Sequence, residues 1–367
     1  MRDLWSTIRS QTVMGGRVAL MLPLLLAGMG STANANPVML VDVNSGVVME
    51  HEDAFRKWYP ASLTKLMTAY TVFRAIRAGE VSLETVVTMS KRAADQPASK
   101  MYFKPGAKMT MDSALKMLLV KSANDVAVAI AETVGGSHDN FVARMNAEAA
   151  ALGMSSSRFV NPHGLPGQGQ YTTARDLAVL AVTLRREYPE YATYFALEGI
   201  NTGKRSFPNY NMLIGRFDGA DGMKTGYICA SGFNQVSSAT RNGRTVVSVV
   251  LGADSLGARA DTSANLLQKG LTTRGSGPRL GALAPYGGGR EAVTDISAEI
   301  CNPKARAVRS EGRDDAGRMK VLSPYIHEMT REPRMAYAGL IVDPTTGSKS
   351  SGSEIANVPI PIPRPTF

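Results

Sequence analysis

The order of apolar and polar residues predicts two pairs of β-strands, one near the start of the chain and one far downstream. Residues 37–51 hold two apolar runs around an Asn-Ser-Gly tripeptide at 44–46, a pattern typical of a hairpin. Residues 231–254 repeat the pattern around an Asn-Gly pair at 242–243, the strongest short signal for a tight turn between strands. A sheet therefore starts early in the chain and is completed late.

Between these strand pairs, residues 62–200 read mostly as helix, because apolar residues recur there every three to four positions. The segments with this spacing are 63–79, 111–120, 124–136, 138–154 and 173–188. We therefore predict an α/β fold of the α+β type. An antiparallel sheet built from both ends of the chain is flanked by helices and carries a helical subdomain.

The first 35 residues have the order of a secretory signal peptide. Arginines come first, the apolar run at 18–30 follows, and small residues lead to an expected cleavage site after Ala35. A membrane anchor is the alternative, but the apolar run is shorter than the roughly 20 residues that a bilayer span needs. We expect a mature chain in the periplasm or cell envelope, without a transmembrane helix.

Composition changes after about residue 275, where the expected globular domain, 36–275, ends. Ten of the 19 prolines lie in residues 276–367, together with glycine-rich and serine-rich stretches. The last ten residues, VPIPIPRPTF, should form extended polyproline-like chain and cannot form an amphipathic anchoring helix. We expect 276–367 to be a mostly irregular tail.

The formal net charge of +10 is mild and dispersed. No dense run of lysine and arginine with interleaved aromatics occurs, which disfavours nucleic acid as a partner. An anionic polymer or membrane face outside the cytoplasm suits this charge better. The two cysteines, Cys229 and Cys301, are too few for a disulfide scaffold and wrongly spaced for zinc. One disulfide is possible after export, and the alternative is a buried apolar Cys229 with an incidental Cys301.

Candidate chemistry begins with a Ser-x-x-Lys pair, Ser62 and Lys65, at the start of an apolar helix. Helical spacing puts the amine one turn from the hydroxyl, where burial lowers the lysine pKa and lets it act as a base toward serine. The pattern alone is weak, because Ser113 and Lys116 satisfy it as well.

Two further motifs follow in the chain. Ser122-Ala123-Asn124 lies at a helix entrance, where taken alone it would be an N-cap. Lys224-Thr225-Gly226 leads into the downstream strand pair, where taken alone it would be an edge lysine and a glycine bend. Together with Ser-x-x-Lys these motifs form the set known from penicillin-binding proteins and class A β-lactamases.

The chain resembles, over residues 37–271, the D-alanyl-D-alanine carboxypeptidases among the low-molecular-mass penicillin-binding proteins, the S11 serine peptidases. The matching blocks are PASLTKLMTAY, FKPG, KSANDVAVAIAE, FVARMNAEAAALGM, NPHGL, YTTARDLA and DGMKTGY. The resemblance implies a β-lactamase/transpeptidase-like fold and places Ser62, not Ser113, in the nucleophile block. His163 and Asp176 also match family blocks, and we expect both to be structural.

By this resemblance, four residues carry the catalysis. Ser62 would be the acylated nucleophile and Lys65 the base that takes its proton. Ser122 would relay a proton toward the leaving D-alanine, and Asn124 would orient Lys65 and the substrate amide. No cofactor or metal is implied.

The resemblance assigns the binding of substrate to five further residues. Lys224 and Thr225 would hold the substrate carboxylate, and Arg259 matches a family arginine that faces it. Gly226 would let the substrate backbone lie along the strand. The backbone N–H groups of the nucleophile and of Tyr227 would form the oxyanion hole. Tyr227 stands where many relatives have histidine.

The implied activity is that of a secreted serine-type D-Ala-D-Ala carboxypeptidase that trims peptidoglycan stem peptides and is acylated by β-lactam antibiotics. A peptidoglycan DD-endopeptidase of the same family shares the catalytic set and is an alternative. A β-lactamase is disfavoured, because no Glu-x-x-Leu-Asn lies between Ser122 and Lys224 to activate a deacylating water. A non-catalytic cell-wall binding protein is the third alternative, and the intact set of polar residues argues against it.

Overall fold

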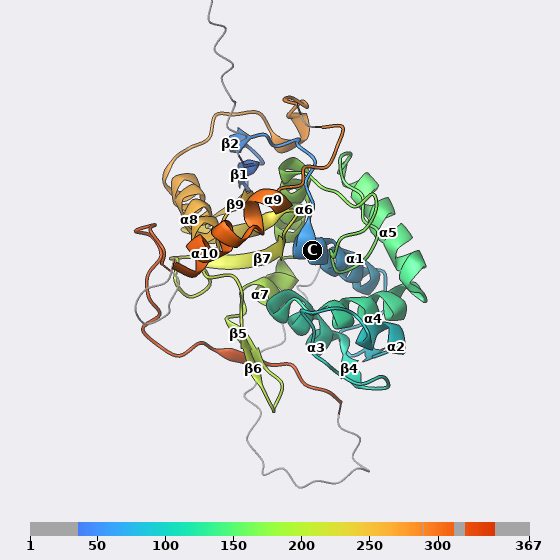
Figure 1. Cartoon of the computed structure of the whole chain (residues 1–367). Coiled ribbons are helices and arrows are strands. Elements are labelled where there is room, and N and C mark those ends of the chain that lie inside the picture. Colours follow the sequence, from blue (N-terminus) through green and yellow to red (C-terminus); the bar gives the residue numbers. More distant parts are fainter. Residues whose placement is uncertain (1–35, 289, 312–319, 342–367) are drawn as a thin grey trace, which may run out of the picture. The chain divides into compact units, whose positions relative to one another are not determined.

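The centre of the fold is a five-stranded antiparallel sheet with the strand order β2-β1-β9-β8-β7 (Figure 1). The computed structural model describes residues 36–288, 290–311 and 320–341. The five strands are β1 (Val38–Asp42), β2 (Val48–Glu52), β7 (Ala220–Ile228), β8 (Gly232–Arg241) and β9 (Arg244–Ala253). The predicted signal peptide and the proline-rich last ten residues lie outside the described residues.

Both predicted hairpins are confirmed. β1 pairs with β2 across the turn at 44–46, and β8 pairs with β9 across Asn242 and Gly243. The φ angles of these two turn residues are 51° and 75°, in the left-handed region that the tightest hairpin turn requires at both positions. Asparagine and glycine adopt this region at low cost, which explains the sequence signal.

The two faces of the sheet are covered by different helices. Along β9, Val247 and Val249 pack in the larger core with α6 (Ala174–Glu187), whereas Val246 and Val250 pack in a second core with α8 (Leu256–Thr272). Successive side chains of a strand point to opposite faces, so the apolar residues of 246–251, which are interrupted by Ser248, serve both cores. β7 is the edge strand and, within the described part of the chain, pairs with β8 alone.

The helical subdomain, to the right of the sheet in Figure 1, confirms the predicted periodic segments. Its main helices are α1 (Thr64–Arg77), α3 (Met111–Lys116), α4 (Asn124–Gly135) and α5 (His138–Ala151). Smaller elements are α2 (Lys91–Ala94), β3 (Val86–Thr88), β4 (Lys108–Thr110) and α7 (Ala192–Phe195). In the described ranges, no helix combines the length and the hydrophobicity needed to cross a bilayer.

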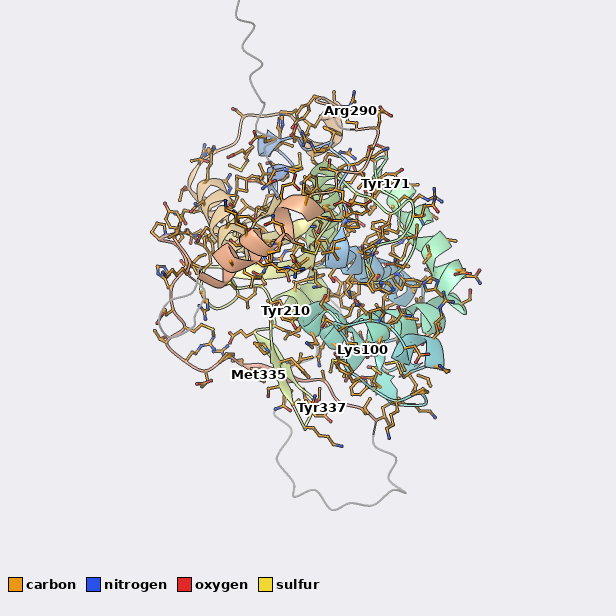
Figure 2. The ribbon with its side chains drawn as sticks, in the orientation of Figure 1. Lys100, Tyr171, Tyr210, Arg290, Met335 and Tyr337 are labelled. Carbon is orange, nitrogen blue, oxygen red and sulfur yellow. A yellow bond between two sulfur atoms is a disulfide. The ribbon has the colours of Figure 1, made fainter. Side chains whose placement is uncertain are left out.

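The chain after α8 contains regular elements that the sequence did not indicate. They are α9 (Ser297–Ile300), α10 (Pro303–Glu311) and β10 (Met335–Tyr337). β10 pairs in parallel with β5 (Gly199–Asn201), which forms a hairpin with β6 (Ser206–Pro208). Figure 2 labels Met335 and Tyr337 beside this hairpin. The segment therefore adds a strand to the rest of the fold.

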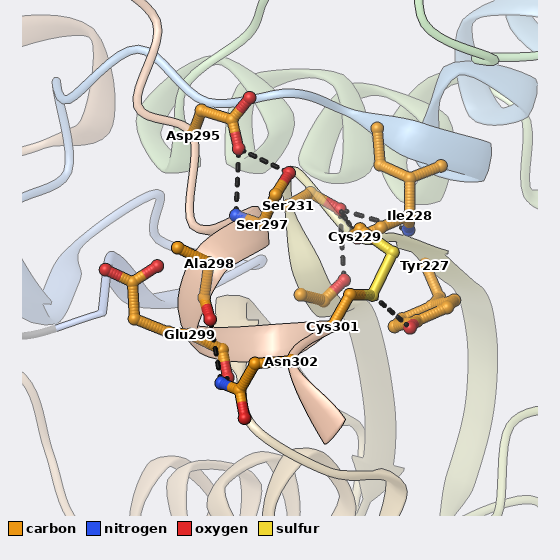
Figure 3. Close-up of a disulfide and its surroundings, with 11 residues drawn as sticks. Tyr227, Ile228, Cys229, Ser231, Asp295, Ser297, Ala298, Glu299, Cys301 and Asn302 are labelled. Carbon is orange, nitrogen blue, oxygen red and sulfur yellow. Dashed lines mark hydrogen bonds between the residues drawn. A yellow bond between two sulfur atoms is a disulfide. The ribbon is translucent and has the colours of Figure 1, made fainter. Parts of the chain in front are cut away.

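A disulfide joins Cys229, directly after β7, to Cys301, directly after α9 (Figure 3). The two Cα atoms are 5.6 Å apart, in the usual range for a disulfide. The hypothesis of one disulfide is thus confirmed by the structure, and it ties the C-terminal segment to the end of the edge strand.

Replacing both cysteines by serine should lower the free energy of unfolding, because the disulfide closes a long loop in the unfolded chain. For a sequence separation of 72 residues the chain-entropy treatment gives at most about 4 kcal/mol. Urea denaturation of the wild type and of the double variant measures the difference. The reduced wild type is the control and should match the double variant. Two free thiols per chain in the denatured, unreduced protein would contradict the disulfide.

Candidate active site

The candidate nucleophile lies where the edge strand of the sheet meets the first helix. Ser62 is in a 3-10 turn, Ala61–Leu63, that leads directly into α1. A Cβ atom on Gly226 of β7 would lie 3.0 Å from the backbone nitrogen of Ser62 and 3.2 Å from the Cβ of Ala61. The strand and the turn are therefore in direct backbone contact, and glycine permits this approach. Glycine at 226 is therefore needed for the contact with the Ser62 turn, in addition to the expected approach of the substrate backbone.

The amine of Lys65 makes hydrogen bonds to three different segments of the chain. Its Nζ lies 3.1 Å from Ser62 Oγ, 2.7 Å from Asn124 Oδ1 and 2.7 Å from the carbonyl oxygen of His163. A charged ammonium has three hydrogens to donate, one to each of these acceptors. When the amine is neutral, its lone pair can accept the Ser62 hydroxyl proton, which is the geometry of a nucleophile with its base.

The electrostatics of Lys65 favour that neutral form. The side chain is fully buried, and burial lowers its pKa well below the ordinary value. The positive charge of Lys224 lowers this pKa further, while Asp125 acts in the opposite direction. Lys65 is thus an amine that gives up its proton more readily than an exposed lysine and can act as a general base.

Ser122 is held in an unusual backbone conformation between two helical elements. It follows a π-helical turn, Met117–Lys121, and its φ of 60° and ψ of 37° are left-handed. Non-glycine residues adopt this region rarely, most often at functional sites. Its Oγ accepts a hydrogen bond of 3.0 Å from Lys224 Nζ. The N-cap of α4 is Ala123, so the explanation of Ser122 as a simple helix cap is wrong.

Lys224 and Arg259 are two buried cations, here called the cationic wall, without a carboxylate partner among the described residues. Each is 2% exposed, and burial, assisted by the charge of Arg259, lowers the pKa of Lys224 to about 7. Lys224 also donates to the carbonyl oxygen of Thr225. Among the residues that the structure describes, Arg259 donates to the carbonyl oxygen of Tyr210, at 3.4 Å, and its Nε has no hydrogen-bond partner. Two buried cations with unused hydrogens form a binding site for an anion.

The loop around His163 contacts the Ser62 turn and Lys65 through its backbone. Burial lowers the pKa of His163 to about 3, so the ring is neutral, and its Nδ1 accepts from the amide of Leu165. The carbonyl oxygen of His163 is the third acceptor for Lys65. Gly164, at φ 88°, approaches the carbonyl of Ala61 so closely that a Cβ would lie 1.8 Å from it.

Sequence reasoning missed one supporting residue, Asp125. Its buried carboxylate accepts hydrogen bonds from the backbone amides of residues 101 and 102, and so fixes a loop beside Asn124. A buried acid directly after the Ser-Ala-Asn motif was the available signal. Asp176 plays a similar structural role for the loop at 156–157. The described part of the chain contains no group of His, Cys, Asp and Glu that could hold a metal ion.

The nine residues singled out from the sequence thus gather in one place. Lys65 connects Ser62 with Asn124, and Lys224 is bonded to Ser122. Gly226 contacts the nucleophile turn, and its neighbours on β7 are Thr225 and Tyr227. Arg259 of α8 lies close enough to Lys224 to lower its pKa.

Comparison with known proteins agrees with this arrangement. Residues 27–255 match the profile of the peptidase S11 family, described as D-alanyl-D-alanine carboxypeptidase. The chain is 36% identical over 247 residues to the D-alanyl-D-alanine carboxypeptidase DacC of Escherichia coli (strain K12). It is 33% identical over 227 residues to DacF of Bacillus subtilis (strain 168). The matches cover 65% and 60% of this chain, and 62% and 57% of the respective relatives.

Solved structures give the same result. The D-alanyl-D-alanine carboxypeptidase DacD from Francisella tularensis superimposes with a TM-score of 0.63 and 33% identity, covering 65% of this chain and 70% of that one. Penicillin-binding protein D2 from Listeria monocytogenes, in its ampicillin-bound form, gives 0.60 and 29%, covering 65% and 98%. The predicted β-lactamase/transpeptidase-like fold is confirmed. The chain belongs to the S11 peptidase family, that of the D-alanyl-D-alanine carboxypeptidases.

Proposed function

We propose that this protein is a serine-type D-Ala-D-Ala carboxypeptidase that removes the terminal D-alanine from peptidoglycan stem peptides and is acylated by β-lactams. The observation that carries the proposal is the hydrogen-bonded pair of half-buried Ser62 and buried Lys65, beside the cationic wall of Lys224 and Arg259. A nucleophile with its own base, next to a binding site for an anion, suits a substrate that is cleaved near a free carboxylate.

The substrate would add to the free edge of β7. Its terminal carboxylate would bind Lys224, Thr225 and Arg259, and its last peptide bond would then reach Ser62, beside Gly226. The backbone N–H groups of Ser62 and Tyr227 would hold the carbonyl oxygen as it becomes negative. Such preorganised donors contribute about 3 kcal/mol each to transition-state stabilisation.

The chemistry would proceed in two steps. Lys65 takes the proton of Ser62 as Oγ attacks the carbonyl carbon of the penultimate D-alanine, and Asn124 keeps the amine in place. The C–N bond breaks, and the amine of the leaving D-alanine receives a proton from the Ser122 hydroxyl, which is replenished by the proton held on Lys65. A water that gives its proton to Lys65 then hydrolyses the ester and restores Ser62.

We also infer that the protein acts outside the cytoplasm, in the periplasm or cell envelope. The disulfide supports this location, because such bonds persist in oxidising compartments. The signal-peptide pattern of residues 1–35 supports it independently. The net charge of +10 suits an anionic cell-wall polymer as the partner.

Ser62→Ala should abolish both D-alanine release from an acyl-D-Ala-D-Ala peptide and covalent labelling by a fluorescent penicillin, because the attacking oxygen is lost. Ser113→Ala is the matched control, a serine in the second Ser-x-x-Lys pattern, and should retain both activities. Labelling that survives the loss of Ser62 would contradict the assignment of the nucleophile.

Lys224→Ala should reduce kcat/KM for a peptide acid about 10- to 100-fold more than for the corresponding peptide amide. A charge-assisted hydrogen bond contributes roughly 1.5 to 3 kcal/mol in a desolvated site. Lys116→Ala removes a lysine that already pairs with Asp112, and should affect both substrates little. Equal losses for acid and amide would show that Lys224 does not recognise the carboxylate.

The kcat/KM for the peptide acid should fall at both low pH and high pH. Lys65 has to be neutral, so activity is lost as the pH falls below its lowered pKa. Lys224 has to be charged, so activity is also lost as the pH rises through the Lys224 pKa of about 7. Lys224→Arg keeps its charge and should move the alkaline limb upward. An identical alkaline limb for acid and amide substrates would contradict this reading.

A further inference from the structure

The last segment that the structure describes, residues 320–341, connects α8 with the β5–β6 hairpin and the helical subdomain. We propose that this segment, the C-terminal strap, positions Arg259 for the substrate carboxylate by joining the two parts of the chain that hold this side chain. The inference rests on the proposed function, in which Arg259 binds the carboxylate.

The guanidinium of Arg259 is held by two separate parts of the chain. Its backbone belongs to α8, and its Nη2 donates to the carbonyl oxygen of Tyr210, in the loop after β6. At 3.4 Å this hydrogen bond is long, so it constrains the side chain weakly. The direction of the guanidinium therefore depends on how firmly α8 and the Tyr210 loop are kept in place relative to each other.

The first anchor of the strap is on α8, two residues after Arg259. The backbone amides of Leu322 and Ser323 both donate to the carboxylate of Asp261, at 2.9 Å. The Ser323 hydroxyl donates to Asn265 Oδ1 at 2.8 Å, one turn further along α8. The beginning of the strap is thus fixed to the helix that carries the arginine.

The second anchor is Glu198, directly before β5. Arg331 forms a bidentate ion pair with the Glu198 carboxylate, at 2.6 and 2.8 Å, and the amide of Arg334 donates to it at 2.7 Å. The hydrogen bond from Arg331 lowers the pKa of Glu198 to about 2, so the carboxylate stays ionised around neutral pH. The carbonyl oxygen of Glu198 accepts from the amide of Asn209, the residue before Tyr210. This anchor therefore fixes the loop next to the carbonyl that holds the arginine.

The end of the strap continues into strand pairing and into the helical subdomain. β10 pairs with β5 so that Met335 lies opposite Gly199, the residue after Glu198 (Figure 2). The amine of Lys116 on α3 donates to the carbonyl oxygen of Tyr337. The strap is thus held on both sides of Glu198 and cannot shift along the hairpin without breaking these bonds.

Positioning of this kind lowers the cost of binding the substrate. An arginine that already points to the place of the carboxylate loses less conformational entropy when the carboxylate binds. If an anchor is lost, α8 and the Tyr210 loop can move relative to each other. Binding of a peptide acid then weakens, whereas the chemistry at Ser62 remains. A peptide amide offers no charged partner to Arg259, so its turnover should change little.

The double variant Glu198→Ala, Arg331→Ala removes the second anchor without changing the net charge. We expect the ratio of kcat/KM for a peptide acid to that for the corresponding amide to fall about 3- to 10-fold, mainly through a higher KM for the acid. The matched control is Glu80→Ala, Arg144→Ala, which removes another bidentate pair, at the surface of the helical subdomain. The control should keep the wild-type ratio.

Asp261→Ala tests the first anchor, and the sign of its effect is informative. The loss of a negative charge two residues from Arg259 would by itself favour the binding of an anion and raise the ratio of acid to amide. Loss of the anchor should lower this ratio. A lower ratio for Asp261→Ala would therefore support the strap, and a higher ratio would contradict it.

Turnover of the amide shows whether the site around Ser62 is intact in each variant. A wild-type ratio in the Glu198→Ala, Arg331→Ala variant, or equal losses for acid and amide, would overturn the positioning role and leave the proposed function intact. A wild type that releases no D-alanine from the acid would overturn the proposed function, and the positioning role with it.

Discussion

The site depends on keeping three cationic side chains, Lys65, Lys224 and Arg259, out of water without an ion pair to any described carboxylate. Each is at most 2% exposed. Removing one such charge from water costs several kcal/mol unless hydrogen bonds or loss of the proton relieve it. The structure uses both means: oxygen atoms surround the two lysine amines, and the pKa of each lysine is lowered. The same burial therefore produces a base next to a serine and a binding site for an anion.

This arrangement requires backbone segments to approach one another closely around the nucleophile. Gly226 lets the edge strand touch the Ser62 turn, and Gly164 lets the His163 loop lie under the same turn. Asp125 fixes the loop on the third side through backbone amides. The contacts that hold the buried lysines thus come from the sheet, the helical subdomain and two loops. All of these parts have to fold before the site can form.

Much of this could be predicted from the sequence, because the information was local. The Asn-Gly pair predicted one hairpin, and the spacing of apolar residues predicted the five main helical segments. The three short motifs identified the residues around Ser62. The resemblance to a known family was needed to prefer Ser62 to Ser113. The spacing Ser-x-x-Lys occurs twice, and the hydrogen bonds of Lys65 to Asn124 and to the carbonyl of His163 distinguish the first pair.

The remaining features could not be predicted, because they rest on contacts between distant backbone atoms. The carbonyl of His163 has no signal in the sequence, and the place of Asp125 after the Ser-Ala-Asn motif does not show which amides it binds. β10 is three residues long and is stabilised by its pairing with β5, far away in the chain. The pairing of Cys229 with Cys301 was open for the same reason, since a separation of 72 residues says nothing about distance in space.

The central claim is that Ser62, with the buried Lys65 as its base, cleaves the last peptide bond of a stem peptide whose carboxylate the cationic wall holds. Mass spectrometry of muropeptides after incubation of the protein with pentapeptide-containing, cross-linked peptidoglycan tests it most directly. The account predicts that monomeric pentapeptides lose the mass of one alanine while the cross-links stay intact. Cleaved cross-links with unchanged pentapeptides would contradict it and assign the protein as an endopeptidase.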